Sequence, residues 1–437
     1  MTQHGKATEK SSFDILDRYL LFADDHQRGW WEKTGRLLER VLASADYDAG
    51  RRLEALTFFS QVMIPSLGPY PFSFRSAITR SGLPIEFSVN YQQRGEAAPV
   101  VRVGFEPLAA TSGSEEDRYN QKPPIDLLDK LQKLPIPGYD DTLFRYFLDA
   151  HTLSHEEREQ LKEKPAIEGS QLTSQAAFGF DLKPEGISIK GYTFPAMKCH
   201  LNGKEFGPFV AESVKPLMER MGPLPAFDMV TDYLEETKGA SQFAFWSFDC
   251  TDASKSRLKL YSSNNSVVWS KIEEIWTLGG RAKSPVVQKG LKYLEELWQL
   301  LGISEGQHEF TGGFDDGKDS TPTPMVWNYE LKKGETTPLT KFYFPVHGES
   351  DERIIRGLSR FLTRIGLGKY GKGYEATVQH YFPERNLSKS ARLTSWISFA
   401  YTEKTGVYLS VYYHSSEDYP WSAQEQAEEV ARGSTTI

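Results

Sequence analysis

The sequence has few cysteines and no long apolar run. Only Cys199 and Cys250 occur among 437 residues, which is too few for a disulfide framework and favours a reducing compartment. No run of about 18 apolar residues appears, so no membrane-spanning helix is predicted. The first residues, MTQHGKATEKSSFD, are polar and lack the apolar stretch of a secretion signal. We therefore expect a cytoplasmic protein.

Positive charge and metal-binding patterns are also scarce. The chain has 51 Lys and Arg against 59 Asp and Glu, a net charge of -8, which argues against a nucleic-acid partner because phosphate backbones need a basic surface. The nine histidines show no HExxH spacing. The stretch DDGKD at 315–319 fits the DDxxD pattern of Mg²⁺-dependent isoprenoid enzymes, but it lies among glycines and prolines and predicts a loop. We expect no metal site.

Apolar spacing indicates helices that alternate with pairs of strands. Spacings of three and four residues predict helices at 14–65, 126–135, 154–164, 208–221, 227–237, 267–277, 286–301, 351–366 and 373–381. Alternating apolar and polar residues predict five hairpins, in which the paired strands are 85–92 with 100–107, 178–182 with 187–194, 243–249 with 257–261, 324–331 with 339–346, and 394–401 with 406–414.

This rhythm predicts an α+β fold in one domain over residues 1–437, with flexible ends at 1–13 and 420–437. The expected architecture is a closed antiparallel barrel ringed by helices and built from repeated helix–helix–strand–strand units. About ten strands enclose a lumen wider than side chains alone can fill.

The second strand of each hairpin has one apolar face and one face of cations and tyrosines. The apolar faces hold Val101, Val103, Ile189, Gly191, Leu258, Leu260, Phe342, Phe344, Leu409 and Val411. The polar faces hold Arg102, Gly104, Lys190, Tyr192, Arg257, Lys259, Tyr261, Lys341, Tyr343, Tyr408 and Tyr412. Ordinary solvent-facing strands are the alternative interpretation. Five strands with cations and tyrosines at the same spacing favour a polar lumen instead.

A lumen of this composition suits the transfer of an isoprenoid group. Arg and Lys bind a diphosphate and neutralise it as it leaves. Tyrosine faces stabilise an allylic cation by about 0.5–2 kcal/mol each. Glu86 shares a face with Ser88 and Asn90 on the first strand, and a carboxylate there can accept the proton that an alkylated ring releases.

Seven segments, in this order, resemble the fungal indole prenyltransferases of the dimethylallyl-tryptophan-synthase family: GLPIEFSVNYQ, VRVGFEP, IKGYTFPAMK, SRLKLY, IEEIWTLGGR, KFYFPVHG and ISFAY…VYLSVYYH. The resemblance spans about residues 20 to 415. It implies a barrel of repeated ααββ units that moves a dimethylallyl group from dimethylallyl diphosphate to an indole by electrophilic aromatic substitution. It also implies a monomer or homodimer that needs no Mg²⁺ or other cofactor.

Two other functions stay open from the sequence. One is prenylation of a phenolic or polyketide acceptor. The other is a ligand-binding barrel without chemistry, which is disfavoured because a carrier of apolar ligands would not bury unpaired charge.

The resemblance assigns roles to particular residues. It makes Glu86 the catalytic base and gives the diphosphate to Arg102, Lys190, Arg257 and Lys259. It forms a tyrosine shield from Tyr192, Tyr261, Tyr343, Tyr408 and Tyr412. It places Ile78, Leu83 and Trp396 in the acceptor pocket, and Gly104, Met325 and Trp327 around the prenyl chain.

The chain departs from the family pattern at two places. Lys341 stands where family members commonly have Gln, so a further cation is expected at the diphosphate. Enzymes acting on free tryptophan carry a Lys shortly before the FDL segment, whereas this chain has QAAF at 175–178. This difference predicts a tryptophan-derived acceptor, such as a cyclic dipeptide or a larger indole alkaloid, in place of free tryptophan.

Overall fold

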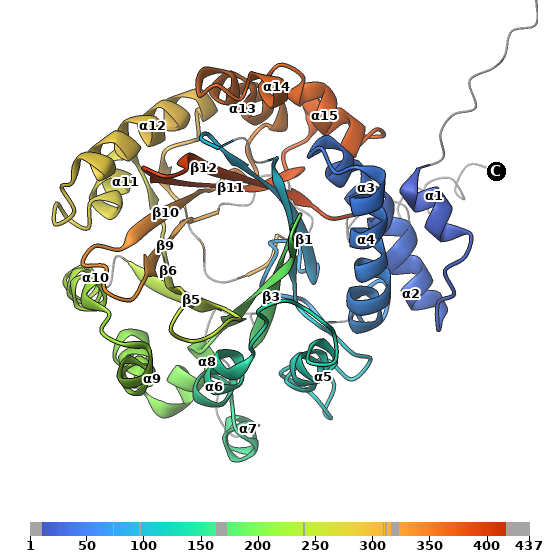
Figure 1. Ribbon diagram of the computed structural model, residues 1–437. Helices are drawn as coiled ribbons and strands as arrows, with labels where there is room; N and C mark the ends of the chain where they lie inside the picture. The colour runs from blue at the N-terminus through green and yellow to red at the C-terminus, as the bar shows by residue number, and fades with distance from the viewer. Residues whose placement is uncertain are drawn as a thin grey trace, which may run out of the picture.

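Ten strands close into an antiparallel barrel in the computed structural model (Figure 1), which describes residues 11–72, 74–95, 98–162, 173–238, 241–308, 310, 313–315 and 323–416. The strands are β1 (Ile85–Gln92), β2 (Val100–Phe105), β3 (Ala176–Lys183), β4 (Gly186–Thr193), β5 (Gln242–Asp249), β6 (Leu258–Asn264), β9 (Met325–Leu331), β10 (Leu339–Phe344), β11 (Thr394–Thr402) and β12 (Gly406–His414). Their order around the barrel is β1-β12-β11-β10-β9-β6-β5-β4-β3-β2. The five predicted hairpins and the fold class are confirmed.

Helices precede every hairpin and ring the barrel (Figure 1). The first unit has α1 (Ser12–Asp17), α2 (Asp25–Trp30), η1 (Trp31–Gly35), α3 (Arg36–Ser44), α4 (Ala49–Phe58), η2 (Phe59–Met63) and η3 (Ile64–Ser66). The second has α5 (Lys122–Leu131), α6 (Thr142–His151) and α7 (His155–Lys162), and the third has α8 (Ala196–Asn202), α9 (Phe206–Met221) and α10 (Pro225–Glu236). The fourth has α11 (Trp269–Trp276) and α12 (Pro285–Leu301), and the fifth has α13 (Asp351–Arg364), α14 (Gly368–Gly371), α15 (Tyr374–Tyr381) and η4 (Leu387–Lys389).

Several elements were not predicted from the sequence. They are α6, α8, α14, η4 and a separate two-stranded sheet of β7 (Ser266–Val267) and β8 (Gly306–Gln307). Apart from α6, which has ten residues, each is brief and carries little periodic signal of its own. Residues 12 and 13, expected in a flexible end, belong to α1, where the Phe13 ring stacks on Trp31 at 4.6 Å between centroids. The other residues expected to be flexible, 1–10 and 420–437, lie outside the described part of the chain.

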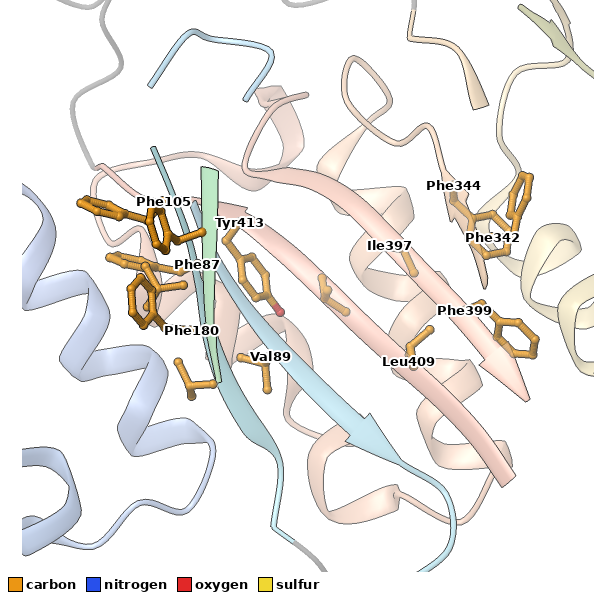
Figure 2. Packing of buried hydrophobic residues seen from close by; sticks show 14 of the residues in the cluster. Phe87, Val89, Phe105, Phe180, Phe342, Phe344, Ile397, Phe399, Leu409 and Tyr413 are labelled. Carbon is orange, nitrogen blue, oxygen red and sulfur yellow. The ribbon is translucent and has the colours of Figure 1, made fainter. Parts of the chain in front are cut away.

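The hydrophobic core lies between the outer face of the barrel and the helices. The Phe87 ring on β1 lies 6.1 Å from Phe59 of η2, and the Phe180 ring on β3 lies 5.6 Å from Phe58 of α4. Figure 2 shows the same arrangement for side chains of several strands, including Phe105, Phe342, Phe344, Phe399 and Leu409. Each such side chain contributes about 1.5–3 kcal/mol by leaving water. The apolar strand faces therefore point outward, and the polar faces point into the lumen.

Helices α12 and α13 approach each other closely at Gly357. A Cβ atom at this position would lie 2.5 Å from the carbonyl oxygen of Leu300. The absence of a side chain therefore sets the spacing of these two helices in the outer ring. Among the described residues, no helix is both long enough and apolar enough to cross a membrane.

Candidate active site

The lumen contains two connected cavities with different linings. The larger cavity, of about 630 Å³, is lined by charged side chains and is called the cationic cavity below. The smaller cavity, of about 180 Å³, is lined mostly by aromatic and apolar side chains and is called the aromatic cavity. Both cavities touch Gly104 and the same four tyrosines, the tyrosine waist: Tyr192, Tyr261, Tyr343 and Tyr412. The lumen is thus divided into two compartments by a layer of phenol rings.

Eight cations line the cationic cavity, and five of them are the ones that the sequence predicts. These five come from separate parts of the barrel wall: Arg102 on β2, Lys190 on β4, Arg257 and Lys259 at the start of β6, and Lys341 on β10. The alternating strand pattern predicts these inward positions. Such a cluster is suited to an anion with several charges, since Arg and Lys donate charge-assisted hydrogen bonds to phosphate oxygens.

Three carboxylates hold four of these cations in place. Asp181 lies 3.1 Å from Arg102 and 2.5 Å from Lys190. These three groups occupy neighbouring strands, because Arg102 pairs with Asp181 between β2 and β3. Burial tends to raise the pKa of Asp181, but Arg102 and Lys190 outweigh that effect and hold it below its usual range. Asp181 is therefore ionised and fixes both cations toward the cavity.

Asp249 and Glu330 hold Arg257 and Lys259 in the same way. Asp249 contacts Arg257 at 3.0 Å and Lys259 at 3.2 Å, and Glu330 contacts Arg257 at 3.2 Å. Sequence reasoning missed all three carboxylates. Strand alternation could have found Asp181, since it is two residues from Gly179, which also lines this cavity.

Lys341 differs from the other four cations. Within the described residues no carboxylate lies within ion-pair distance of it, and its Nζ lies 4.6 Å from the centroid of the Tyr408 ring. Arg102 donates a hydrogen bond to the hydroxyl of that tyrosine. Burial, with Arg102 nearby, lowers the pKa of Lys341 well below its ordinary value. Burial also lowers the pKa of Lys190, to about 8, although Asp181 opposes the change.

The tyrosine waist is held together by ring and hydroxyl contacts. The Tyr261 and Tyr343 hydroxyls lie 3.2 Å apart, and the Tyr343 ring lies 6.1 Å from Tyr412. Phe245 stacks on Tyr261 at 4.0 Å between centroids. Burial raises the pKa of Tyr192, Tyr261 and Tyr343, so these phenols stay neutral and present electron-rich faces. Tyr408, predicted in the same shield, lies in the cationic cavity alone.

Glu86 is the carboxyl group of the aromatic cavity. It lies on β1, and its Oε1 accepts a hydrogen bond of 2.6 Å from the Ser395 hydroxyl on β11. Burial raises the pKa of Glu86 to about 8, and the hydrogen bond from Ser395 partly opposes that rise. A carboxyl group with a pKa near neutrality is suited to accepting and releasing a proton. Ile78 and Trp396, both predicted, line the same cavity.

Three predicted pocket residues lie elsewhere. Met325 and Trp327 are fully buried in the core and line neither cavity, so the geometry does not support the prediction that they bound the prenyl chain. Alternation along β9 instead brings Val326 into the aromatic cavity. Leu83 is also buried in the outer core and does not line the cavity, so its predicted role in acceptor binding is not supported. Sequence reasoning missed Ala77, Val326 and three aromatic residues, Phe178, Phe194 and Phe245.

The described residues contain no group of three or more His, Cys, Asp or Glu side chains that could hold a metal ion. Asp315, the first residue of the DDxxD-like stretch, is fully buried, with its Oδ2 3.2 Å from His347 Nε2. Residues 316–319 of this stretch lie outside the described part of the chain.

Comparison with known proteins agrees with this geometry. Residues 26–377 match the family described as tryptophan dimethylallyltransferase. The chain belongs to this family. It is 67% identical over 434 residues to the prenyltransferase phqI of Penicillium fellutanum, with 95% of this chain and 94% of the relative covered. It is 42% identical over 419 residues to the deoxybrevianamide E synthase notF of an Aspergillus species, with 94% of this chain and 92% of that protein covered.

Solved structures of the family share the barrel. A crystal structure of NotF in complex with brevianamide F and DMSPP superposes with a TM-score of 0.84 at 38% identity, covering 94% of this chain and 100% of NotF. The crystal structure of AnaPT from Neosartorya fischeri superposes with a TM-score of 0.82 at 26% identity, covering 93% and 98% of the two chains. The predicted membership of the indole prenyltransferase family is therefore confirmed.

Proposed function

We propose that the protein transfers a dimethylallyl group from dimethylallyl diphosphate to the indole ring of a tryptophan-derived acceptor, and that no metal ion is required. The observation that carries the proposal is the division of the lumen. A cationic cavity suited to a diphosphate meets an aromatic cavity suited to an indole, and the tyrosine waist lies at their junction. An allylic cation formed at the waist faces phenol rings on one side and the acceptor ring on the other.

The charged residues supply the first part of the mechanism. Arg102, Lys190, Arg257, Lys259 and Lys341 neutralise the diphosphate as its bond to the allylic carbon breaks. Their charge takes the part that Mg²⁺ plays in metal-dependent isoprenoid enzymes, which supports metal independence. Asp181, Asp249 and Glu330 keep four of the five cations in fixed positions before the donor binds, so little reorganisation is needed.

Glu86 supplies the second part. The acceptor ring attacks the allylic cation, and the ring must then lose a proton to recover aromaticity. Glu86 is the carboxyl group that lines the aromatic cavity, and Trp396 lines the same cavity, which we propose as the acceptor space. We assign it the role of the base that receives this proton.

Two observations support a cyclic dipeptide as acceptor. The relative NotF has been crystallised with brevianamide F, a cyclic dipeptide that carries an indole. In this chain the start of β3 carries Gln175, Ala176 and Ala177, so it offers no cation for the carboxylate of a free amino acid. A neutral cyclic dipeptide needs none.

The test is turnover of labelled dimethylallyl diphosphate with a panel of acceptors in parallel. The panel contains brevianamide F, free L-tryptophan, a phenolic compound and a polyketide. We expect the highest kcat/KM with brevianamide F. A clear preference for free tryptophan contradicts the acceptor class, a preference for the phenol or the polyketide contradicts indole recognition, and donor binding without transfer to any acceptor indicates a binding protein.

A further inference from the structure

Lys341 is an unusual member of the cationic cavity because it lacks the close ion pair that two other lysines have. Lys190 and Lys259 lie 2.5 Å and 3.2 Å from Asp181 and Asp249, whereas within the described residues no carboxylate is in ion-pair contact with Lys341. Its Nζ faces the Tyr408 ring, 4.6 Å from the ring centroid. The charged or titratable groups that face it from other elements are mostly cations: Arg102, Lys190, Arg257, Glu330, Lys404 and Tyr408.

These surroundings make the protonation of Lys341 depend on the ligand. Without the donor, its ammonium form is opposed by removal from water, by Arg102, by Lys190 and by Arg257, and it is favoured by Glu330 and by the Tyr408 ring face. A bound diphosphate reverses the balance, because it brings several negative charges into contact with the amine. Donor binding therefore draws a proton onto Lys341.

We propose that Lys341 is the general acid of the reaction: it takes up a proton when the diphosphate of the donor binds, and it gives that proton to the diphosphate as it leaves. This inference rests on the proposed function. It explains why this position carries an amine. An amine whose proton is weakly held is a better acid than an ion-paired ammonium, and it can act just when the leaving group becomes most basic.

The other groups of the cavity are poorer acids. Arg102 and Arg257 are guanidinium groups, which do not lose a proton in proteins. Lys190 and Lys259 each lie at ion-pair distance from a carboxylate, although burial still lowers the pKa of Lys190 to about 8. Burial raises the pKa of Tyr192 and Tyr343, which makes their hydroxyls weaker acids than ordinary phenols.

The step balances in atoms and charge. The bond between the allylic carbon and the diphosphate oxygen breaks with both electrons on the oxygen. The Lys341 ammonium transfers its proton to the departing diphosphate and becomes a neutral amine. The indole carbon forms the new bond to the allylic carbon, and its proton passes to Glu86. After release of the products, Glu86 loses this proton to water and Lys341 remains neutral until the next donor binds.

The first test measures proton uptake and does not depend on turnover. Binding of dimethylallyl thiolodiphosphate, the DMSPP of the related structures, is followed by calorimetry at pH 8 in two buffers that differ in ionisation enthalpy. The wild-type protein should take up more protons per bound ligand than Lys341→Arg or Lys341→Gln. Lys332→Arg changes a lysine of the same cavity that has a carboxylate partner, Glu330 at 3.3 Å, so it serves as the matched control and should keep the wild-type uptake. Equal uptake in wild type and Lys341→Arg overturns the proposal.

The second test separates an acid from a fixed positive charge. Lys341→Arg keeps a cation in the cavity but removes a transferable proton. We expect a donor KM within about threefold of wild type and a kcat lower by about 10²-fold or more, the usual contribution of a general acid. Melting temperature on the same preparation checks folding. A folded Lys341→Arg protein with the kcat of the wild type overturns the proposal. If the wild-type protein binds DMSPP with proton uptake but transfers no prenyl group from dimethylallyl diphosphate, the proposed function alone is refuted.

Discussion

Ser395 on β11 donates a hydrogen bond of 2.6 Å to Glu86 on β1, and the carboxyl group of Glu86 lines the aromatic cavity. The contact depends on an irregularity in β11, whose register with β12 shifts between Thr394 and Trp396. At this bulge the Ser395 hydroxyl reaches Glu86 while the next residue, Trp396, lines the aromatic cavity, although a regular strand would direct consecutive side chains to opposite faces. The serine thereby fixes the orientation of the carboxyl group that we assign as the base.

The first prediction concerns the role of Glu86 as base. Glu86→Gln keeps the size and the hydrogen bond of the side chain but removes its ability to take a proton. We expect kcat to fall by about 10²–10⁴-fold with little change in donor KM. Turnover and melting temperature are measured on one preparation. A folded variant with near wild-type turnover rules out the assigned role.

The same variant should gain stability at high pH. The pKa of Glu86 is about 8 in the folded protein and 4.5 as the ordinary value. Its contribution to stability is therefore present below pH 4.5 and is lost as the pH rises through about 8. Because Gln has no charge to bury, Glu86→Gln should melt above the wild type at pH 8.5 and close to it at pH 5.5.

The second prediction is a pH profile controlled by Ser395. Since the base must be ionised, kcat/KM should rise with pH and level off above about 8. The Ser395 hydrogen bond lowers the pKa of Glu86, so Ser395→Ala should move the rise to higher pH. Ser398→Ala, on the same strand but near Tyr412, is the control and should leave the profile in place. An unchanged profile in Ser395→Ala contradicts the pairing.

The third prediction is that activity survives removal of metal ions. The cations of the lumen supply positive charge to the diphosphate, so excess EDTA should change the initial rate by less than about twofold. The assay compares EDTA-treated enzyme with and without added Mg²⁺. Complete loss that only Mg²⁺ restores would show that the cations are not sufficient.

The fourth prediction separates two adjacent residues of β9. Trp327→Ala should cost about 3–5 kcal/mol of unfolding free energy, because its ring lies in the outer core, and should not improve transfer from geranyl diphosphate. Val326→Phe should instead reduce acceptor kcat/KM at little cost in stability, because Val326 lines the aromatic cavity. Denaturant unfolding and turnover are measured for both. Better geranyl transfer by folded Trp327→Ala would return this residue to the prenyl pocket.

The fifth prediction concerns the contact between α12 and α13. At a helix position with free space for a methyl group, Gly→Ala raises the free energy of unfolding by about 0.4–1 kcal/mol. At Gly357 the added carbon would lie 2.5 Å from the Leu300 carbonyl oxygen, so Gly357→Ala should destabilise by about 1–3 kcal/mol. Gly368→Ala is the control, because the nearest atom to its added carbon is at 3.8 Å, and it should be neutral or stabilising. Chemical denaturation distinguishes the two signs.

Strand alternation in the sequence is sufficient to predict the barrel and its cationic lumen. Residues two apart, such as Lys190 with Tyr192 and Lys341 with Tyr343, share a face in any regular strand. The same rule applied to β9 places Val326 inward and Trp327 outward, so the prediction for Trp327 that the geometry does not support came from a loose alignment within the family.

Other features need three-dimensional contacts that no local pattern contains. Ser395 reaches Glu86 at a bulge in β11, which the alternation of the sequence does not reveal. The pairing of Asp181 with Arg102 joins residues 79 positions apart, and it arises only once β2 and β3 are aligned. The burial that raises the pKa of Glu86 likewise depends on the closed barrel.

Three of the four strands of the waist carry a cation of the cationic cavity and, two positions along, a tyrosine that also lines the aromatic cavity: Lys190 and Tyr192 on β4, Lys259 and Tyr261 on β6, and Lys341 and Tyr343 on β10. Recognition of the two substrates is therefore interleaved along the chain and not assigned to separate segments. Exchange of a hairpin between two members of the family transplants part of both specificities at once. Substrate range in such a barrel changes most cleanly by single substitutions at one depth of the lumen.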